Sequence, residues 1–187
     1  EDAVFVEPIA AACRIGKQID LAGDDVVTVL GDGRLGNLCA QVLRFQGCQV
    51  RVVGKHEFKL RILEDLGILT TKLGELQPDR ISDIVVDCTG SPSGLPTALQ
   101  LVRPCGTIVL KTTVAAEQTL HMAPFVIDEI KLVGSRCGPF ADAIELLGKR
   151  AISVAPLHSA SYPLEEAHAA FEHAIRKDAL KVLFDVR

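Results

Sequence analysis

Three glycines in the first quarter of the chain have the spacing that holds phosphate groups. Gly31, Gly33 and Gly36 form the pattern G-x-G-x-x-G. They follow the apolar residues 26–30 and precede a helical pattern, which is the setting in which this motif binds a dinucleotide. The first glycine permits the tight turn, the second lets phosphate approach the backbone, and the third packs the helix on the strand. The N-terminus of the helix then faces the anion, so we predict a pyrophosphate cradle.

The residues between these glycines are expected to contribute less than the backbone N–H groups. Arg34 and Leu35 open the predicted helix and should lie beside the phosphates. Asp32 would place a carboxylate next to the pyrophosphate, an unfavourable arrangement unless its side chain points to solvent or Arg34 offsets the charge. In the simpler alternative, Asp32 is a turn residue and Arg34 is an exposed first-turn side chain.

The residue that ends the second predicted strand bears on the choice of cofactor. An acidic residue about 20 residues after the glycines hydrogen-bonds the ribose 2′-hydroxyl of NAD. Gly54 holds that position here. Lys55, His56 and Lys59 follow it, where cations would hold a 2′-phosphate. We therefore predict NADP in preference to NAD, although Glu57 reduces the basic character. Alternatively, Gly54 only turns the chain and the cations belong to a solvated helix start.

Apolar runs alternate with helical stripes along the whole chain. The expected strands are 26–30, 49–53, 84–88, 107–110, 130–134 and 181–186. The expected helices run from Pro8 to about Leu21 and over 35–43, 60–66, 95–102, 140–147 and 164–171, with a turn at 104–106. Strands that are continuously apolar belong to a parallel sheet covered on both faces. The sequence therefore predicts an α/β protein with a doubly wound parallel sheet, the Rossmann fold, in three αβα layers.

Composition limits the classes of partner. The 187 residues fit one dinucleotide-binding domain over 1–187, and 48% hydrophobic with 24% charged residues is typical of a globular chain. We expect no membrane span, because no apolar run approaches about 18 residues. The net charge of −4 and the scattered basic residues give no reason to expect nucleic acid as a partner.

The cysteine pattern bears on the cellular compartment. The six cysteines stand singly, without C-x-x-C or metal-finger spacing, and several lie in apolar segments. We interpret them as reduced core thiols of a cytoplasmic protein, with disulfides as the less favoured alternative.

Several blocks occur in the order found in one known family. They are FVEPIAAA at 5–12, the Gly31 motif, VDCTG at 86–90 and LVGSRCGPF at 132–140, followed by YPLEEAH at 162–168 and KVL at 181–183. Together they resemble the C-terminal coenzyme-binding domain of medium-chain, zinc-type alcohol dehydrogenases, over essentially the whole chain. The resemblance implies hydride transfer between an alcohol or polyol and the nicotinamide in the parent enzyme, with zinc polarising the substrate oxygen.

The resemblance also carries over individual positions. Thr89, Gly90 and Thr112 correspond to cofactor contacts, and all follow the C-terminal ends of expected strands. Glu7 corresponds to a residue that can lie near zinc in polyol-type members, although a place at the start of the Pro8 helix explains it more simply. Asp87 is expected to accept backbone N–H groups at its strand end and not to act as an acid or base.

The family's N-terminal catalytic domain supplies most of the zinc ligands, and nothing in this chain matches its motifs. We therefore assign no catalytic residue here, expect zinc in the parent enzyme and not in this chain, and expect the chain by itself to be inactive. It looks cut from a longer protein, whose missing domain would partly cover an apolar surface on segment 153–187. The edge strand at 130–133 would allow a homo-oligomer, although burial within one subunit explains its apolar residues equally well.

Two other functions remain as alternatives. One is the coenzyme domain of a zinc-free quinone or enoyl reductase, in which the cofactor alone supplies the chemistry. The other is a non-catalytic module that binds NADP(H).

Overall fold

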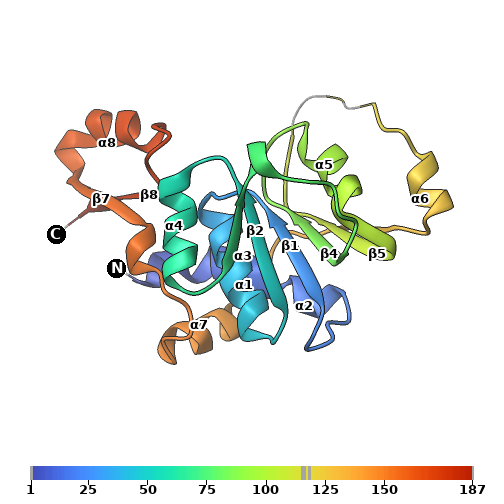
Figure 1. The fold of residues 1–187 in the computed structure, drawn as a ribbon. Coiled ribbons are helices and arrows are strands. Elements are labelled where there is room, and N and C mark those ends of the chain that lie inside the picture. Colours follow the sequence, from blue (N-terminus) through green and yellow to red (C-terminus); the bar gives the residue numbers. More distant parts are fainter. Residues whose placement is uncertain (1, 115–116, 118, 187) are drawn as a thin grey trace.

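Six parallel strands form the central sheet of the protein (Figure 1). The computed structural model describes residues 2–114, 117 and 119–186. The strand order is β3-β2-β1-β4-β5-β6. The strands are β1 (Val26–Leu30), β2 (Gln49–Gly54), β3 (Leu69–Lys72), β4 (Ser82–Asp87), β5 (Val102–Leu110) and β6 (Lys131–Gly134). The strand order reverses between β1 and β4, as in the doubly wound sheet that the sequence predicts.

Helices cover both faces of this sheet and complete three αβα layers. Alternate residues of the strands belong to two separate apolar clusters, one on each face of the sheet. On one face, Val27 and Val29 pack with α1 (Val6–Cys13), α3 (Arg34–Phe45) and α7 (Phe140–Gly148). Leu30 and Val53 pack on the other face with α5 (Gly94–Leu101). Burial on both faces explains why these strands are continuously apolar in the sequence. The remaining helices of this part are α2 (Ile15–Gln18), α4 (Glu57–Asp65) and α6 (Ala123–Ile127), with 3-10 turns η1 (Asp2–Phe5) and η2 (Leu73–Glu75).

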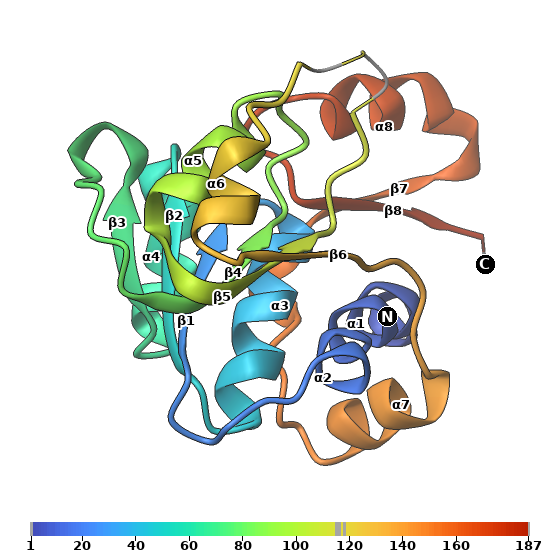
Figure 2. The same ribbon diagram turned by 90° about the vertical axis from the view of Figure 1, so that its right-hand side faces the viewer.

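The C-terminal segment forms a small unit of its own. β7 (His158–Pro163) and β8 (Lys181–Asp185) pair in parallel as a separate two-stranded sheet, joined by η4 (Leu164–Glu166) and α8 (Ala167–Ala174) and preceded by η3 (Ala155–Leu157). Figure 1 shows these orange and red elements at the left, to one side of the central strands, and Figure 2 shows α8 above β7 and β8. Phe171 and Ile175 leave 65% and 85% of their surface exposed here. Exposed apolar residues thus occur on the described part of segment 153–187, where the sequence predicts an apolar surface.

Several local expectations were wrong. The expected strand 181–186 forms β8 outside the central sheet, where it pairs with β7, which was not predicted. The N-terminal helix is divided into α1 and α2 and ends at Gln18, because Ile19 is extended. The strand β3 was missed, since its sequence LTTK is short and half polar. Residues 104–106 are not a turn between elements: they form an irregularity inside β5, where the register shifts and Cys105 takes a φ of 60°.

All six cysteines lie in the described part of the chain and are free thiols. Cys13, Cys39 and Cys48 are buried, whereas Cys105 and Cys137 are exposed and so are not core thiols. Among the described residues, no helix is long and apolar enough to cross a membrane.

Candidate functional site

The turn between β1 and α3 has the geometry that the glycine spacing predicts. Gly31 takes a φ of +111°, which side chains other than glycine rarely allow. A Cβ atom at Gly36 would overlap the carbonyl oxygen of Gly31, so only glycine lets α3 pack this closely on the turn. Gly33 caps the helix in extended conformation, and a Cβ there would meet nothing within 4 Å. Open space therefore lies beside Gly33 at the start of α3, where the first N–H groups of a helix have no partner within the helix.

This turn lies at the point where ligands bind in doubly wound sheets. Gly31 donates its N–H to Val53 at the end of β2, and Cys88 donates to Leu30 from the loop that follows β4. Both bonds hold the loops at the C-terminal edge of the sheet, beside the reversal between β1 and β4. A cavity opens on each side of the turn.

The first cavity, of about 200 Å³, lies on the β2 side. It is lined by Gly31, Asp32, Gly54, Lys55, His56, Thr89, Ser91, Thr97 and neighbouring residues. Its position at the ends of β1 and β2 matches the place where a Rossmann domain holds the adenosine ribose. Gly54, Lys55 and His56, predicted from the sequence, are therefore brought together with the glycine turn.

Lys59 is not brought to this cavity. Only 8% of the residue is exposed, and its Nζ lies 5.5 Å from the centre of the Phe58 ring. Lys59 is the third residue of α4 (Glu57–Asp65), and it is not among the residues that line the cavity.

Asp32 points neither to solvent nor along the phosphate path. Its Oδ2 atom accepts the backbone N–H groups of Lys55 and His56, both at 2.6 Å. The His56 Nδ1 lies 3.1 Å from the same oxygen. The carboxylate therefore closes the turn between β2 and α4, a role that the sequence spacing alone does not indicate.

The second cavity, of about 520 Å³, lies on the β5 side of the turn. Its lining includes Glu7, Arg34, Leu35, Lys111, Thr112, Ser135 and Arg136. Three cations thus face one carboxylate there. This cavity matches the place of the nicotinamide half of a dinucleotide that crosses the sheet at the glycine turn.

Arg34 is the cation nearest the start of α3. Its Nη1 donates to the carbonyl oxygen of Leu180 at 3.3 Å, while its Nε is buried and has no hydrogen-bond partner among the described residues. Burial and the charge of Arg34 lower the pKa of Lys181, and Glu7 acts in the opposite direction. The Arg34 side chain therefore brings a positive charge to the lining of the larger cavity, next to the N-terminus of α3, where an anionic phosphate would be favoured.

Asp87 organises the loops that follow β4 and β5. Its Oδ1 accepts the backbone N–H of Thr89 at 2.9 Å and the hydroxyl groups of Thr89 and Thr112 at 2.7 and 2.9 Å. Thr112 in turn accepts the N–H of Gly90 at 3.1 Å. The buried Asp87 is thus an acceptor of backbone and hydroxyl groups, as expected. Thr89 and Thr112 line the two cavities, whereas Gly90 lines neither.

The side chain of Lys111 joins two segments that line the larger cavity. The Nζ atom donates to the carbonyl oxygens of Ala11 and Arg136, which joins α1 to the loop after β6. Burial lowers the pKa of this ammonium group. The lysine thereby holds together Ala11 and Arg136, which line the larger cavity with it. Its place directly after the apolar end of β5 is the sequence signal for such a role.

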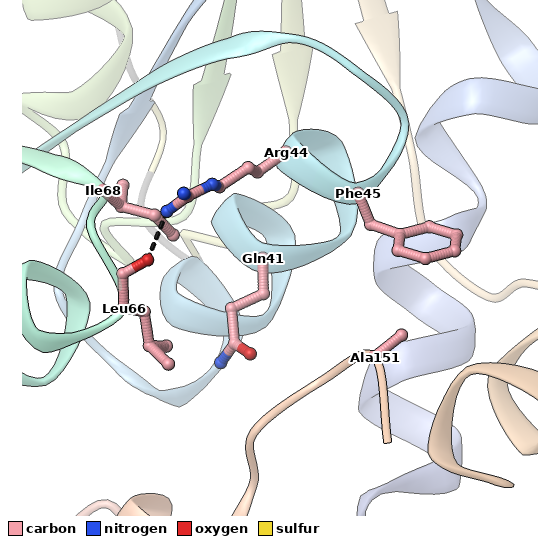
Figure 3. Close-up of a pocket in the computed structure, with 6 residues that line it drawn as sticks. All are labelled: Gln41, Arg44, Phe45, Leu66, Ile68 and Ala151. Carbon is pink, nitrogen blue, oxygen red and sulfur yellow. Dashed lines mark hydrogen bonds between the residues drawn. The ribbon is translucent and has the colours of Figure 1, made fainter. Parts of the chain in front are cut away.

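Another pocket lies on the opposite end of α3 and contains no predicted site residue. Figure 3 shows Arg44 reaching from α3 to the carbonyl oxygen of Leu66, with Gln41, Phe45, Ile68 and Ala151 around it. This arginine has a structural partner and lies away from the glycine turn, so we assign the pocket no part in the site.

The family model for zinc-binding dehydrogenases matches residues 35–149 of the chain. This chain belongs to the zinc-binding dehydrogenase family. Sorbitol dehydrogenase of Mus musculus is 27% identical over 201 residues, which cover 98% of this chain and 56% of that protein. The chain therefore spans little more than half the length of this curated relative.

Solved structures show the same fold as this member of the family. L-idonate 5-dehydrogenase from Escherichia coli superposes with a TM-score of 0.90 at 24% identity, over 98% of this chain and 57% of that one. A zinc-binding dehydrogenase from Sinorhizobium meliloti, bound to NADP, gives 0.89 at 22% identity, over 97% and 58% of the two chains.

The described residues of this zinc-binding dehydrogenase chain do not fit a zinc ion. Within 2–114, 117 and 119–186, no three His, Cys, Asp or Glu side chains gather as metal ligands would. Catalytic zinc needs three protein ligands, and Glu7 supplies one carboxylate at most. A nicotinamide dinucleotide does fit, because the glycine turn has open space beside Gly33 and a cavity lies on each side of the turn. When bound, that cofactor supplies the group that transfers hydride.

Proposed function

We propose that this chain is the coenzyme-binding part of an alcohol or polyol dehydrogenase that uses a nicotinamide dinucleotide. The observation that carries the proposal is a pair of cavities on either side of the glycine turn, one beside Gly54 and the other beside Lys111. Gly31, Gly33 and Gly36 belong to the turn between them, and Arg34 and Leu35 line the larger cavity. In this proposal Thr89, Gly90 and Thr112 contribute cofactor contacts from the loops that Asp87 holds.

The relatives favour the same reaction class. The similar proteins include sorbitol dehydrogenase of mouse and D-xylulose reductase A of Aspergillus oryzae. These names, with the family match, favour an enzyme that oxidises a hydroxyl group of a polyol over a zinc-free quinone or enoyl reductase or a non-catalytic module. Zinc in the complete enzyme is part of this proposal, with ligands beyond those described here; Glu7 at the edge of the larger cavity would be one carboxylate near it.

The proposed cofactor is NADP in preference to NAD. Lys55 and His56 line the adenosine side, and Gly54 contributes no carboxylate of its own. Cations there favour a 2′-phosphate. The NADP in the Sinorhizobium meliloti structure supports the same cofactor in a protein of the same fold. Lys59 no longer contributes to this preference, since it lies outside the cavity lining.

Two contacts with other protein parts belong to the proposal. The exposed apolar residues of segment 153–187, among them Phe171 and Ile175, would pack on a catalytic domain. The edge strand β6, where Leu132 is exposed, would pair two copies in a homo-oligomer in the cytoplasm. Light scattering of the protein and of Leu132→Lys tests the second contact, because a charge on an edge strand opposes pairing.

Calorimetric titration of the full-length protein with NADPH and NADH tests the proposed function. We expect both reduced cofactors to bind and NADPH to bind more tightly. Oxidation of sorbitol, followed through the absorbance of the reduced nicotinamide, tests the reaction class. A folded protein that binds neither cofactor contradicts the proposal, and tighter binding of NADH contradicts only the preference for NADP.

A further inference from the structure

We propose that Asp32 limits the preference for NADP, because it places at the end of β2 the carboxylate that position 54 lacks. This inference rests on the proposed function, since it names a specificity-determining residue of the same site. It assigns to a residue of the glycine turn the role that an acidic residue at the strand end has in NAD-binding Rossmann domains.

The position of the Asp32 side chain is the first observation. A Cβ atom added at Gly54 would lie 2.5 Å from the Cβ of Asp32, 2.8 Å from its Cγ and 2.7 Å from its Oδ2. The Asp32 carboxylate therefore occupies the space into which a side chain at the end of β2 would extend. Two positions far apart in the sequence thus share one volume, which only one of them can fill.

The hydrogen bonds of Asp32 are the second observation. Both N–H groups at the start of the β2–α4 turn, those of Lys55 and His56, donate to Oδ2 at 2.6 Å. The Asp32 side chain is only 9% exposed. Bonds of this kind to an ionised acceptor are strong and hold the carboxylate in one orientation. Because a carboxylate offers about four acceptor positions, it can still accept a further hydroxyl group from the cavity that it lines.

The two cofactors would meet this carboxylate differently. The ribose 2′-hydroxyl of NAD can donate a hydrogen bond to it. The 2′-phosphate of NADP is an anion that only accepts, so the two negative charges repel each other. The N–H groups of Lys55 and His56 are already bonded to Asp32 and cannot bind the phosphate. The His56 Nδ1 also lies against Asp32, at 3.1 Å from Oδ2, so Lys55 is the cation of this lining left to attract the phosphate, and Asp32 opposes it.

Cofactor affinities of Asp32→Asn test the inference in the full-length protein. Asparagine has nearly the same shape but no charge, so we expect the ratio of NADPH to NADH affinity to rise by at least about tenfold, or about 1.4 kcal/mol. Glu57→Gln is the matched control. Glu57 lies in the first turn of α4, pairs with Lys72 and Arg61, and does not line the cavity. This control should change the ratio by less than about threefold, because exposed charges are screened.

An unchanged ratio in an Asp32→Asn protein that binds both cofactors overturns the inference and reduces Asp32 to a structural cap of the turn. Asp32→Ser keeps an oxygen acceptor for the backbone and decides the matter if the asparagine variant does not fold. A crystal structure of the wild type with NADH is an independent test. If the ribose 2′-hydroxyl makes no hydrogen bond to Asp32, the inference is also overturned. Failure of the proposed function can be distinguished from failure of this inference, because the wild type would then bind neither cofactor.

Discussion

Helix α3 begins where it does because residue 36 has no side chain to collide with the carbonyl oxygen of Gly31. Gly33, in the same turn, has open space where a Cβ would be. The two glycines therefore satisfy different requirements. One allows the turn and helix to pack, and the other leaves room for a ligand.

Alanine substitutions separate these requirements. Gly36→Ala should lower the free energy of unfolding by about 3 kcal/mol, as overpacking does. Gly33→Ala should change it by less than about 0.5 kcal/mol, because its φ of −73° suits alanine. The same Gly33 variant should lose at least about tenfold in dinucleotide affinity, since its Cβ would occupy the phosphate path. Urea unfolding measures the free energy of unfolding, and calorimetry measures the affinity. Normal affinity in the Gly33 variant would show that the phosphate does not lie beside Gly33.

The structure changes the expected result of Gly54→Asp. From the sequence alone, this substitution should weaken NADPH binding and spare or improve NADH binding. In the folded protein the new side chain would collide with Asp32 and add a second buried carboxylate. We now expect the single variant to lower the melting temperature and weaken binding of both cofactors.

Adding Asp32→Gly to Gly54→Asp should restore NADH binding to within about tenfold of the wild type, because one carboxylate again occupies the shared volume. Thermal unfolding and titration of the single and double variants check this. Equal behaviour of the two would show that the residues do not compete for space.

Arg34→Ala should lower the affinity for both NADPH and NADH by about tenfold, because the variant loses a cation at the N-terminus of α3. Arg44→Ala is the matched control on the same helix. Its guanidinium group binds Leu66 at the other end of α3, so its loss should affect stability and leave affinity unchanged. Titrations of both variants with NADH decide the point. Equal losses of affinity in Arg34→Ala and Arg44→Ala would show that any positive charge on α3 has this effect, and that Arg34 makes no specific contact with the cofactor.

Alkaline pH should destabilise the protein through Cys13. Burial, with Asp142 and Cys39 as smaller causes, raises the pKa of this thiol to about 11. Between pH 9 and 11 the unfolded chain releases the proton while the folded chain keeps it, so stability falls as the pH rises. The loss from this thiol should reach about 3 kcal/mol. Cys13→Ala should reduce the loss between urea unfolding at pH 8 and pH 11, although it costs some stability at neutral pH. An identical loss in the variant would assign it to other groups.

The sequence by itself determined the glycine turn and the strand–helix alternation of the central sheet. These signals are local: a strand, a turn and a helix that lie next to each other in the chain fix their own geometry. It could not reveal β3 or β7, because short half-polar strands resemble loops until a neighbour pairs with them. Nor could it place 104–106 inside β5, since that irregularity exists only against the register of β4.

For the site, the residues of the turn and of the strand ends were predictable, because parallel strands bring their C-terminal ends to one edge of the sheet. Which side chains reach the cavities was decided by tertiary structure. Lys59 is not among the residues that line the cavity, and Lys111 finds carbonyl oxygens from two distant segments. Asp32 lies against Gly54 only because β1 and β2 pair side by side. The local sequence around either residue gives no sign that the two positions compete for the same space.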